Sequence, residues 1–427
     1  MRSLAAGEIP LSGKVSECGT EFLDYGTVRA CRAFIVSDEA TGGQTGCRPD
    51  LRLEDRMWDG AARRKGNARG RGTGLSKVRE LLKPVAQDGA ALTREEARAA
   101  LVEMLEGKAS ELETGALLTA LATRGELAPE LAGFVEEMRA RATEIPLTEE
   151  ERASIVDTCG TGGGGPQTFN ISTGAALVAA AAGARVAKHG NRAVTSRCGS
   201  ADVLEALGVP ITLEPKLAAE CLRETGFVFL HAPMLHPAMK AVAGVRNALG
   251  FRTIFNLCGP LTNPAGARTQ VIGVLAPSRA LLVARTLLEL KSTRHAFVVH
   301  GSDGLDELTT TGESVTVRVE PAGDPAMKAA KITPEMAGLE RSTLDQLGGG
   351  DAEANAEILY DILTGMTGPK RDIVLLNAAA ALVACGVAAS LREGVERGAE
   401  AIASGMAAAT LARLRQFGQR WAAQPGA

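Results

Sequence analysis

The sequence predicts an α/β protein, with a small all-helical N-terminal domain and a larger α/β domain built on a largely parallel central sheet. Two observations lead to this fold class. Between residue 75 and about residue 143, apolar residues recur at helical spacing. From about residue 145 onward, short apolar runs typical of strands alternate with helical segments, which is the order expected of strand–helix–strand crossovers.

The first 74 residues differ from the rest of the chain. They carry three of the eight cysteines, show poor hydrophobic periodicity and end in an Arg/Gly tract at 63–74. We expect an extension with little stable structure, or a start codon assigned too far upstream. The tract suits a nucleic-acid contact, and a solvated linker is the simpler interpretation of so short a run.

The helical domain is predicted to span residues 75–144. Thr93 and Glu96 form a capping box that opens one helix, and Gly107 ends it. A second helix covers 112–122, and Pro129 suits the first turn of a third. Part of the insertion 231–264 is expected to return to this domain and complete it.

The α/β domain is predicted to span residues 145–420. An uncharged run at 373–390 carries Asn377, Gly386 and mostly alanine, which favours a buried core helix over a membrane-spanning one. The expected strands lie near 154–158, 185–188, 227–230, 270–275, 296–300 and 314–319. Helices are expected between them, among others at 200–207, 216–224 and 278–290.

Composition narrows the classes of partner. The 47 basic and 50 acidic residues give a net charge of −3, which offers no electrostatic footprint for general nucleic-acid binding. The cysteines form no C-x-x-C pair, and the N-terminus has no apolar signal-peptide core. We therefore expect a cytoplasmic protein with reduced thiols that binds small molecules, not nucleic acid or membranes.

A glycine-rich loop at 157–173 is predicted to join a strand to a helix. Five glycines lie between Gly160 and Gly165, and Ser172 or Thr173 suits the helix N-cap. Glycine lets backbone N–H groups approach phosphate oxygens, and a helix N-terminus favours negative charge. The loop is predicted to bind phosphate; a flexible linker is the alternative. Its spacing matches neither the dinucleotide fingerprint nor the P-loop.

Two further loops follow predicted strands. The loop 188–202 combines Lys188 with hydroxyls and glycines, which favours a second phosphate contact over a surface lysine at a strand end. The loop 301–311 carries Asp303, Asp306 and Glu307. Adjacent carboxylates repel unless a cation lies between them, and magnesium prefers carboxylates together with substrate phosphates. A solvated acidic turn is the alternative for this loop.

Seven motifs between residues 75 and 414 occur in the order found in one enzyme family. On these motifs the chain resembles the anthranilate phosphoribosyltransferases. They are Thr161-Gly-Gly, Asn170-Ile-Ser-Thr173, Lys188-His-Gly-Asn191, Gly199-Ser-Ala-Asp202, Val245-Arg-Asn-Ala-Leu-Gly250, Asn256-Leu-Cys-Gly-Pro-Leu-Thr-Asn-Pro264 and Leu305-Asp-Glu-Leu308.

The resemblance implies transfer of phosphoribosyl from phosphoribosyl pyrophosphate to the amine of anthranilate in tryptophan biosynthesis, with Mg²⁺, by a homodimer associating through the helical domain. It implies magnesium carboxylates at Asp306 and Glu307, with Ser172 as an additional ligand. Asn191 and Arg246 would face anthranilate, and Lys188 and Arg246 would join the carboxylates as catalytic residues. Contacts to phosphoribosyl pyrophosphate would come from Gly160, Gly162, Gly163, Thr168, Asn170, Ser172, Thr173, Lys188 and Ser200.

His189 is left with three roles: a core-facing histidine, a substrate contact or a proton acceptor. The chain also departs from the family pattern. Gly164 stands where the family usually has Asp, Thr195 and Cys198 stand where serines are common, and the first 74 residues have no counterpart.

Two alternative functions share the fold. A pyrimidine-nucleoside phosphorylase would bind phosphate and a nucleoside, but Arg246 with Asn191 suits a benzoate-like acceptor better. A non-catalytic nucleic-acid-binding relative should lack the acidic pair and show a basic groove, whereas this chain has Asp306 and Glu307 and is net acidic.

Overall fold

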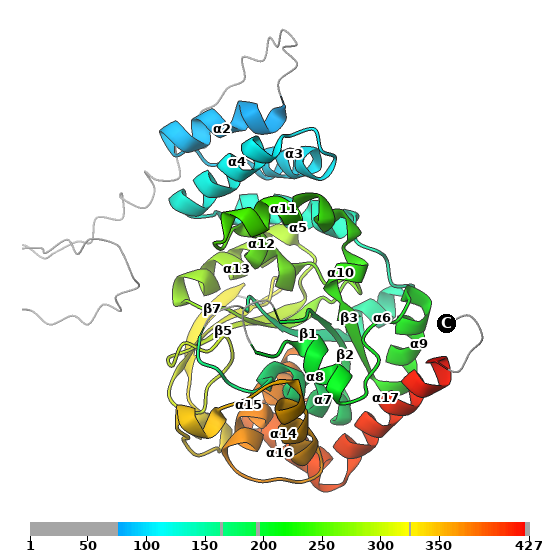
Figure 1. Cartoon of the computed structure of the whole chain (residues 1–427). Helices are drawn as coiled ribbons and strands as arrows, with labels where there is room; N and C mark the ends of the chain where they lie inside the picture. The colour runs from blue at the N-terminus through cyan, green and yellow to red at the C-terminus, as the bar shows by residue number, and fades with distance from the viewer. Residues whose placement is uncertain (1–75, 163–164, 194–196, 324–325, 423–427) are drawn as a thin grey trace, which may run out of the picture. The chain divides into compact units, whose positions relative to one another are not determined.

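The computed structural model describes residues 76–162, 165–193, 197–323 and 326–422 (Figure 1). The predictions made for the extension 1–74, for Gly163 and Gly164, and for Thr195 lie outside these ranges.

Four helices form the N-terminal bundle. Ser76, Thr93 and Ser110 each cap a helix, because the side-chain oxygen accepts a hydrogen bond from the backbone N–H three residues later. Thr93 and Glu96 form the predicted capping box, and Pro129 lies in the first turn of the last helix, as predicted. The helices are α2 (Lys77–Asp88), α3 (Arg94–Leu105), α4 (Glu111–Arg124) and α5 (Ala128–Ala140).

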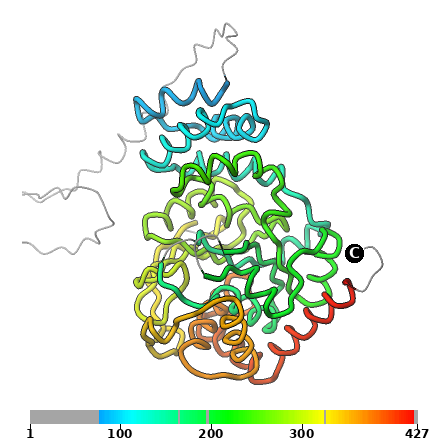
Figure 2. Tube along the Cα trace, viewed as in Figure 1, coloured from blue at the N-terminus to red at the C-terminus, as the bar shows by residue number. Residues whose placement is uncertain are grey.

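A segment from the middle of the chain packs against this bundle. Helix α11 contacts α3 and α4, and α12 contacts α4 and α5. Figure 2 shows this green segment beside the cyan helices. The segment contains α10 (Ala232–Leu235), η1 (Pro237–Met239), α11 (Lys240–Leu249), α12 (Ile254–Cys258) and η2 (Gly259–Leu261). The exact limits of the domains remain a prediction.

A seven-stranded sheet organises the rest, in the order β3-β2-β1-β4-β5-β6-β7. Strands β3, β2, β1, β4 and β5 pair with their neighbours in parallel, whereas β6 pairs antiparallel with both β5 and β7. The predicted fold class is therefore confirmed, and all six expected strands are present. They are β1 (Ile155–Gly160), β2 (Arg185–Gly190), β3 (Phe227–His231), β4 (Thr269–Gly273), β5 (His295–Gly301) and β6 (Ser314–Val319), with β7 (Met327–Ile332) added.

The two faces of the sheet belong to two cores. Val271 and Val299 belong to the core that includes the packed helices α7 (Ile171–Ala181) and α15 (Pro369–Ala384). Their neighbours Ile272 and Val298 belong to a second core with α13 (Pro277–Leu290) and the N-terminal bundle. Alternate strand residues point to opposite faces, so one sheet joins both cores.

The C-terminal part is helical. The predicted buried helix at 373–390 is α15, which ends at Ala384 before a turn with Gly386 at φ 78°. No helix in the described ranges is long and apolar enough to cross a membrane.

The remaining elements of the chain are α6 (Glu149–Ser154), α8 (Ser200–Ala206), α9 (Pro215–Thr225), η3 (Pro334–Ala337), η4 (Leu344–Leu347), α14 (Ala352–Leu363), α16 (Leu391–Ala403) and α17 (Met406–Ala422).

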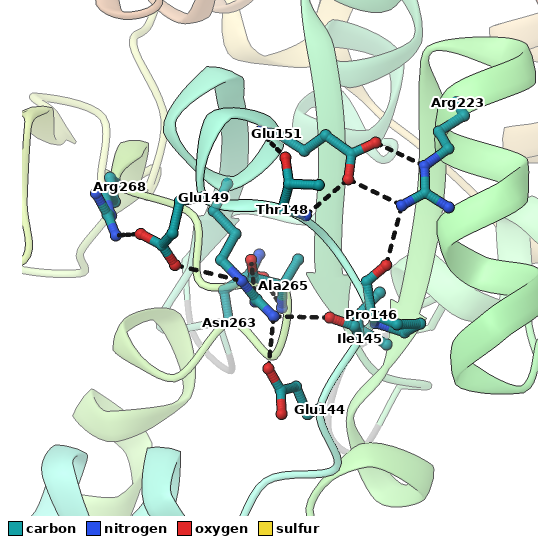
Figure 3. A network of polar contacts seen from close by, with 11 residues as sticks. Glu144, Ile145, Pro146, Thr148, Glu149, Glu151, Arg223, Asn263, Ala265 and Arg268 are labelled. Carbon is teal, nitrogen blue, oxygen red and sulfur yellow. Dashed lines mark hydrogen bonds and ion pairs between the residues drawn. The ribbon is translucent and has the colours of Figure 1, made fainter.

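A polar network fastens the two connections between the bundle and the sheet (Figure 3). The Arg152 guanidinium donates to the carbonyls of Ile145 and Ala265, at 2.8 and 3.0 Å, and pairs with Glu144 at 2.8 Å. Arg223 pairs with Glu151, which holds the pKa of that carboxyl down at about 2. Arg152 thus joins the connection that leaves the bundle, at Ile145, to the connection that leads back into the sheet, at Ala265.

Candidate active site

The candidate site lies at the carboxyl ends of the parallel strands, around the point between β1 and β4 where the strand order reverses. Ligands of open α/β sheets bind at this position. The glycine-rich loop follows β1, Lys188 lies near the end of β2, and the acidic loop follows β5. The three predicted loops therefore meet at one edge of the sheet.

The glycine-rich loop packs directly on the acidic loop. The Gly162 N–H donates to Asp306 Oδ2 at 3.1 Å. A Cβ atom at Gly160 would lie 2.4 Å from the same oxygen, and one at Gly273 would lie 1.6 Å from the Asp306 carbonyl oxygen. Glycine is needed at Gly273 because the Asp306 backbone occupies that space, whereas a side chain at Gly160 would displace the Asp306 carboxylate.

The first loop also reaches the second. The helix N-cap is Asn170, not Ser172 or Thr173 as predicted, because α7 already begins at Ile171. Ser172 and Thr173 thus lie in the first helical turn, where Thr173 Oγ1 donates to Ser200 Oγ at 3.2 Å. Thr168 forms a bridge with Gly348, on a loop that the sequence reasoning did not include.

Lys188 is buried at the centre of the site. Its ammonium donates to the Thr158 carbonyl and lies 3.4 Å from Ser172 Oγ. Burial lowers the pKa of Lys188, and the neighbouring Asp157 opposes that change. Asp157 is itself buried and accepts from Asn263 Nδ2 at 2.8 Å and from the His189 N–H at 3.1 Å. A surface lysine, the alternative role, is excluded because the residue is 1% exposed.

The carboxylates of the acidic loop divide into two groups. Asp303 accepts hydrogen bonds from Thr309 Oγ1 and Thr311 Oγ1, at 2.5 and 2.8 Å, and so holds its own turn. Asp306 and Glu307 instead line a small cavity that Ser172 also lines. Burial, and next the adjacent Asp306, raise the pKa of Glu307 well above its usual range. In the described part of the chain, no cluster of three or more His, Cys, Asp or Glu side chains could hold a metal.

A larger cavity of about 430 Å³ opens beside the glycine-rich loop. Arg246 lines it with its guanidinium 5.3 Å from the centre of the Phe255 ring. Burial lowers the pKa of Arg246. Among the described residues the guanidinium has no carboxylate partner. The cavity is lined by residues of both the bundle side and the sheet, including Gly160, Thr161, His189, Asn191, His236, Arg246 and Phe255.

Two histidines lie beside each other on the wall of this cavity, with their ring planes tilted by 58°. The rings of His189 and His236 have centroids 5.1 Å apart. His189 Nδ1 lies 3.2 Å from the Gly259 carbonyl, and its buried Nε2 has no partner among the described residues. Burial, with a smaller contribution from His236, lowers the pKa of His189 to about 3. The ring is therefore neutral at neutral pH, with Nδ1–H donating and the Nε2 lone pair unused.

Comparison with known proteins identifies the family. The helical bundle domain of a glycosyl transferase family matches residues 79–142, and the a/b domain of that family matches residues 152–408. Anthranilate phosphoribosyltransferase of Brevibacillus brevis is 51% identical over 329 residues, which are 77% of this chain and 94% of the relative. The chain belongs to the anthranilate phosphoribosyltransferases.

Other anthranilate phosphoribosyltransferases agree in sequence and structure. The Moorella thermoacetica enzyme is 50% identical to this chain, and the matched region spans 78% of this chain and 97% of that enzyme. The Thermus thermophilus crystal structure is 42% identical, with a TM-score of 0.74, and all of it is covered by 81% of this chain. The Saccharomyces cerevisiae enzyme in complex with PRPP and Mg is 26% identical, with a TM-score of 0.73 over 81% of this chain and 98% of that one.

In this chain, the structure brings together most of the predicted site residues. Gly160, Gly162 and Asp306 are in contact, as are Thr173 with Ser200 and Lys188 with Ser172. His189, Asn191 and Arg246 line the larger cavity.

Sequence reasoning missed His236, Asn355, Asn377 and the run Gly348-Gly349-Gly350-Asp351. That glycine-rich run precedes a helix just as the first loop does, so the same signal was available for it. No pattern singled out the two asparagines, which become informative only through their contacts.

Proposed function

We propose that this chain transfers the phosphoribosyl group from phosphoribosyl pyrophosphate to the amine of anthranilate, giving N-(5-phosphoribosyl)anthranilate and pyrophosphate in tryptophan biosynthesis. One observation carries the proposal: Gly160 and Thr161 of the glycine-rich loop and Arg246 of α11 line a single cavity. A phosphorylated sugar and a carboxylate-bearing aromatic amine fit such a cavity together. The Saccharomyces cerevisiae relative has been solved with 4-fluoroanthranilate.

The phosphate-binding role is assigned to the loops that meet at the sheet edge. Backbone N–H groups of the glycine-rich loop and the N-terminus of α7 suit the phosphates, and the buried Lys188 amine lies 3.4 Å from Ser172 Oγ in the first turn of that helix. The proposed contacts are Gly160, Gly162, Gly163, Thr168, Asn170, Ser172, Thr173, Lys188 and Ser200; Gly163 lies outside the described residues.

The donor set fits magnesium. Asp306 and Glu307 would hold it with Ser172, which lines the same small cavity. Glu307 has a pKa raised by burial and by its acidic neighbour, so a bound cation relieves an unfavourable charge. Magnesium prefers one or two carboxylates plus substrate oxygens, and it would neutralise the charge that develops on pyrophosphate.

The acceptor site is assigned to Arg246, Asn191 and His189. Arg246 has a planar guanidinium suited to a carboxylate, and no ion pair to a described carboxylate competes for it. The neutral amine attacks the anomeric carbon, a C–N bond forms, and the C–O bond to pyrophosphate breaks. The proton then leaves the new ammonium to water or to the unpartnered His189 Nε2, which is a weak base.

A direct assay tests this function. Purified protein is incubated with magnesium, phosphoribosyl pyrophosphate and anthranilate, and the loss of anthranilate fluorescence is followed with a control lacking phosphoribosyl pyrophosphate. We expect anthranilate fluorescence to fall only in the complete mixture, with one pyrophosphate released for each anthranilate consumed. Phosphorolysis of thymidine or uridine without anthranilate turnover would instead favour the nucleoside-phosphorylase alternative, and tight binding to DNA without turnover the nucleic-acid-binding one.

The assembly and location are also proposals. We infer a cytoplasmic homodimer that associates through the helical domain, taken as residues 75–144 with part of 231–264. Leu112 on α4 is a suitable position for the test, because its side chain is 82% exposed on that bundle. Sedimentation of wild type and L112E tests it: a dimer that L112E converts to monomers is expected, and a monomeric wild type would contradict it.

A further inference from the structure

Asn355, near the start of α14, is 1% exposed and uses both ends of its side-chain amide. Its Oδ1 accepts from the Gly350 N–H at 2.7 Å, and its Nδ2 donates to Asn170 Oδ1 at 2.9 Å. Asn170 Nδ2 in turn donates to the Cys198 carbonyl at 3.2 Å. These hydrogen bonds form one chain across three loops.

The same three loops pack closely around this chain. Thr168 bridges Gly348, and a Cβ at Gly349 would lie 2.4 Å from the Phe169 nitrogen. The Cys198 thiol, whose pKa burial raises to about 11, also hydrogen-bonds with the Asn355 side chain. The loop 348–351 is therefore fitted onto the residues that lead into α7.

The direction of every hydrogen bond in the chain is fixed. The Gly350 N–H can only donate, so Asn355 Oδ1 must accept; the Cys198 carbonyl can only accept, so Asn170 must donate with Nδ2 and present Oδ1 to Asn355. Position 355 thus needs one acceptor and one donor in the geometry of a carboxamide. Aspartate has the same shape but no donor when ionised.

We propose that Asn355 is a positioning residue for the reaction: through Asn170 it sets the glycine-rich loop against the second loop, and so fixes the phosphate-binding end of the site. The proposal rests on the proposed function. Thr173 and Ser200 support it, because their hydroxyls, 3.2 Å apart, come from these two loops and are held at hydrogen-bonding distance.

The test compares N355D and N355A with wild type and with T286V. Thr286 is a matched control, since it is fully buried on α13 and, within the described part of the chain, its hydroxyl bonds to that helix alone, at the Leu282 carbonyl. We expect the Kd for phosphoribosyl pyrophosphate with magnesium, measured by calorimetry without anthranilate, to rise about tenfold or more in both Asn355 variants. The KM for anthranilate should change less than about twofold, and T286V should lower Tm without changing either constant.

A double variant separates positioning from folding. Since Asn355 acts through Asn170, N355A should weaken binding much less in an N170A background than in wild type. Additive effects, or unchanged affinity in N355D, would overturn the proposal. So would unfolding of N355D, N355A and the milder N355S alike, because that would assign a purely structural role. Because the Kd is measured without anthranilate, this result is distinct from a failure of the proposed function. In that case the wild-type protein itself would not convert anthranilate.

Discussion

At the scale of single residues, burial decides the chemistry of the site. Lys188, Asp157 and His189 are all buried within one small region, and their hydrogen bonds compensate only part of the cost. Lys188 faces Ser172 Oγ and His189 lines the larger cavity, whereas the Asp157 carboxylate is held by Asn263 and by the His189 N–H.

The carboxylate pair gives the first prediction. D306N/E307Q should fold normally and lose turnover, because the pyrophosphate charge is left uncompensated. The measurement is initial rate over a magnesium titration, with thermal unfolding as the check on folding. E313Q is the control, since Glu313 is a surface partner of Lys331. A double variant with wild-type rates would remove these residues from the metal site.

Arg246 gives the second prediction. R246A should raise the KM for anthranilate by a factor corresponding to roughly 1.5–3 kcal/mol, the value of a charge-assisted hydrogen bond. The Kd for phosphoribosyl pyrophosphate should stay nearly constant. R341A, which breaks a surface pair with Glu335 at 2.7 Å, should change neither. Equal weakening of both substrates would assign Arg246 to the whole site and not to the acceptor.

His189 gives the third prediction, which concerns the stability of the protein at low pH. Its folded pKa, lowered to about 3 by burial, lies below the usual 6.5. The unfolded state therefore binds more protons between these values, and stability is lost as the pH falls from about 6.5 toward about 3. H189Q should show a smaller fall in Tm between pH 7 and pH 4 than wild type. Parallel curves would mean that the ring is protonated alike in both states.

At the scale of elements, local patterns predicted what local forces determine. The six expected strands and the capped helices depend on nearby residues, and all were found. Strand β7 was missed because Met327–Ile332 is an exposed edge strand with no alternation of apolar residues. The N-cap of α7 was placed too late because serine and threonine outweighed Asn170 in the prediction. The pairing of Thr168 with Gly348 depends on tertiary packing that no local pattern encodes.

The helix α15 gives the fourth prediction. Asn377 donates to the Leu308 carbonyl at 2.8 Å and accepts from the Leu308 N–H at 2.9 Å, next to Glu307. N377L should lower the free energy of unfolding by about 1–3 kcal/mol, because both backbone groups lose their buried partner. It should also raise the magnesium concentration needed for half-maximal rate. Urea unfolding and a magnesium titration measure the two effects; a loss of stability alone would confine Asn377 to the core.

At the scale of the whole molecule, the sequence predicted the helical part, the sheet and three of the loops that meet at its edge. It also predicted that part of 231–264 returns to the bundle, and the family resemblance grouped Arg246 with Asn191, but no pattern placed His236 in the cavity that this return forms. Side chains far apart in sequence become one site only through this return.

The extension gives the fifth prediction. A chain that begins at Gly74 should match full length in Tm and in kcat/KM, since residues 76–422 already contain both cores and all three loops. Thermal unfolding and the fluorescence assay make the comparison. Poor solubility or slower turnover of the shorter chain would show that the extension contributes to the enzyme.

The crowding of Gly160 and Gly273 against Asp306 has a consequence for how the protein can change over evolutionary time. Replacing a glycine by alanine is often a route to greater heat resistance, because it restricts the unfolded chain. At Gly273 that route is closed, since the added methyl group would overlap the backbone carbonyl oxygen of Asp306, and at Gly160 it would push the Asp306 carboxylate out of its position. Selection for thermal tolerance must therefore act on glycines such as Gly244 on α11, where an added Cβ would meet no heavy atom nearer than Glu111 Oε1 at 3.8 Å, and must leave this corner unchanged.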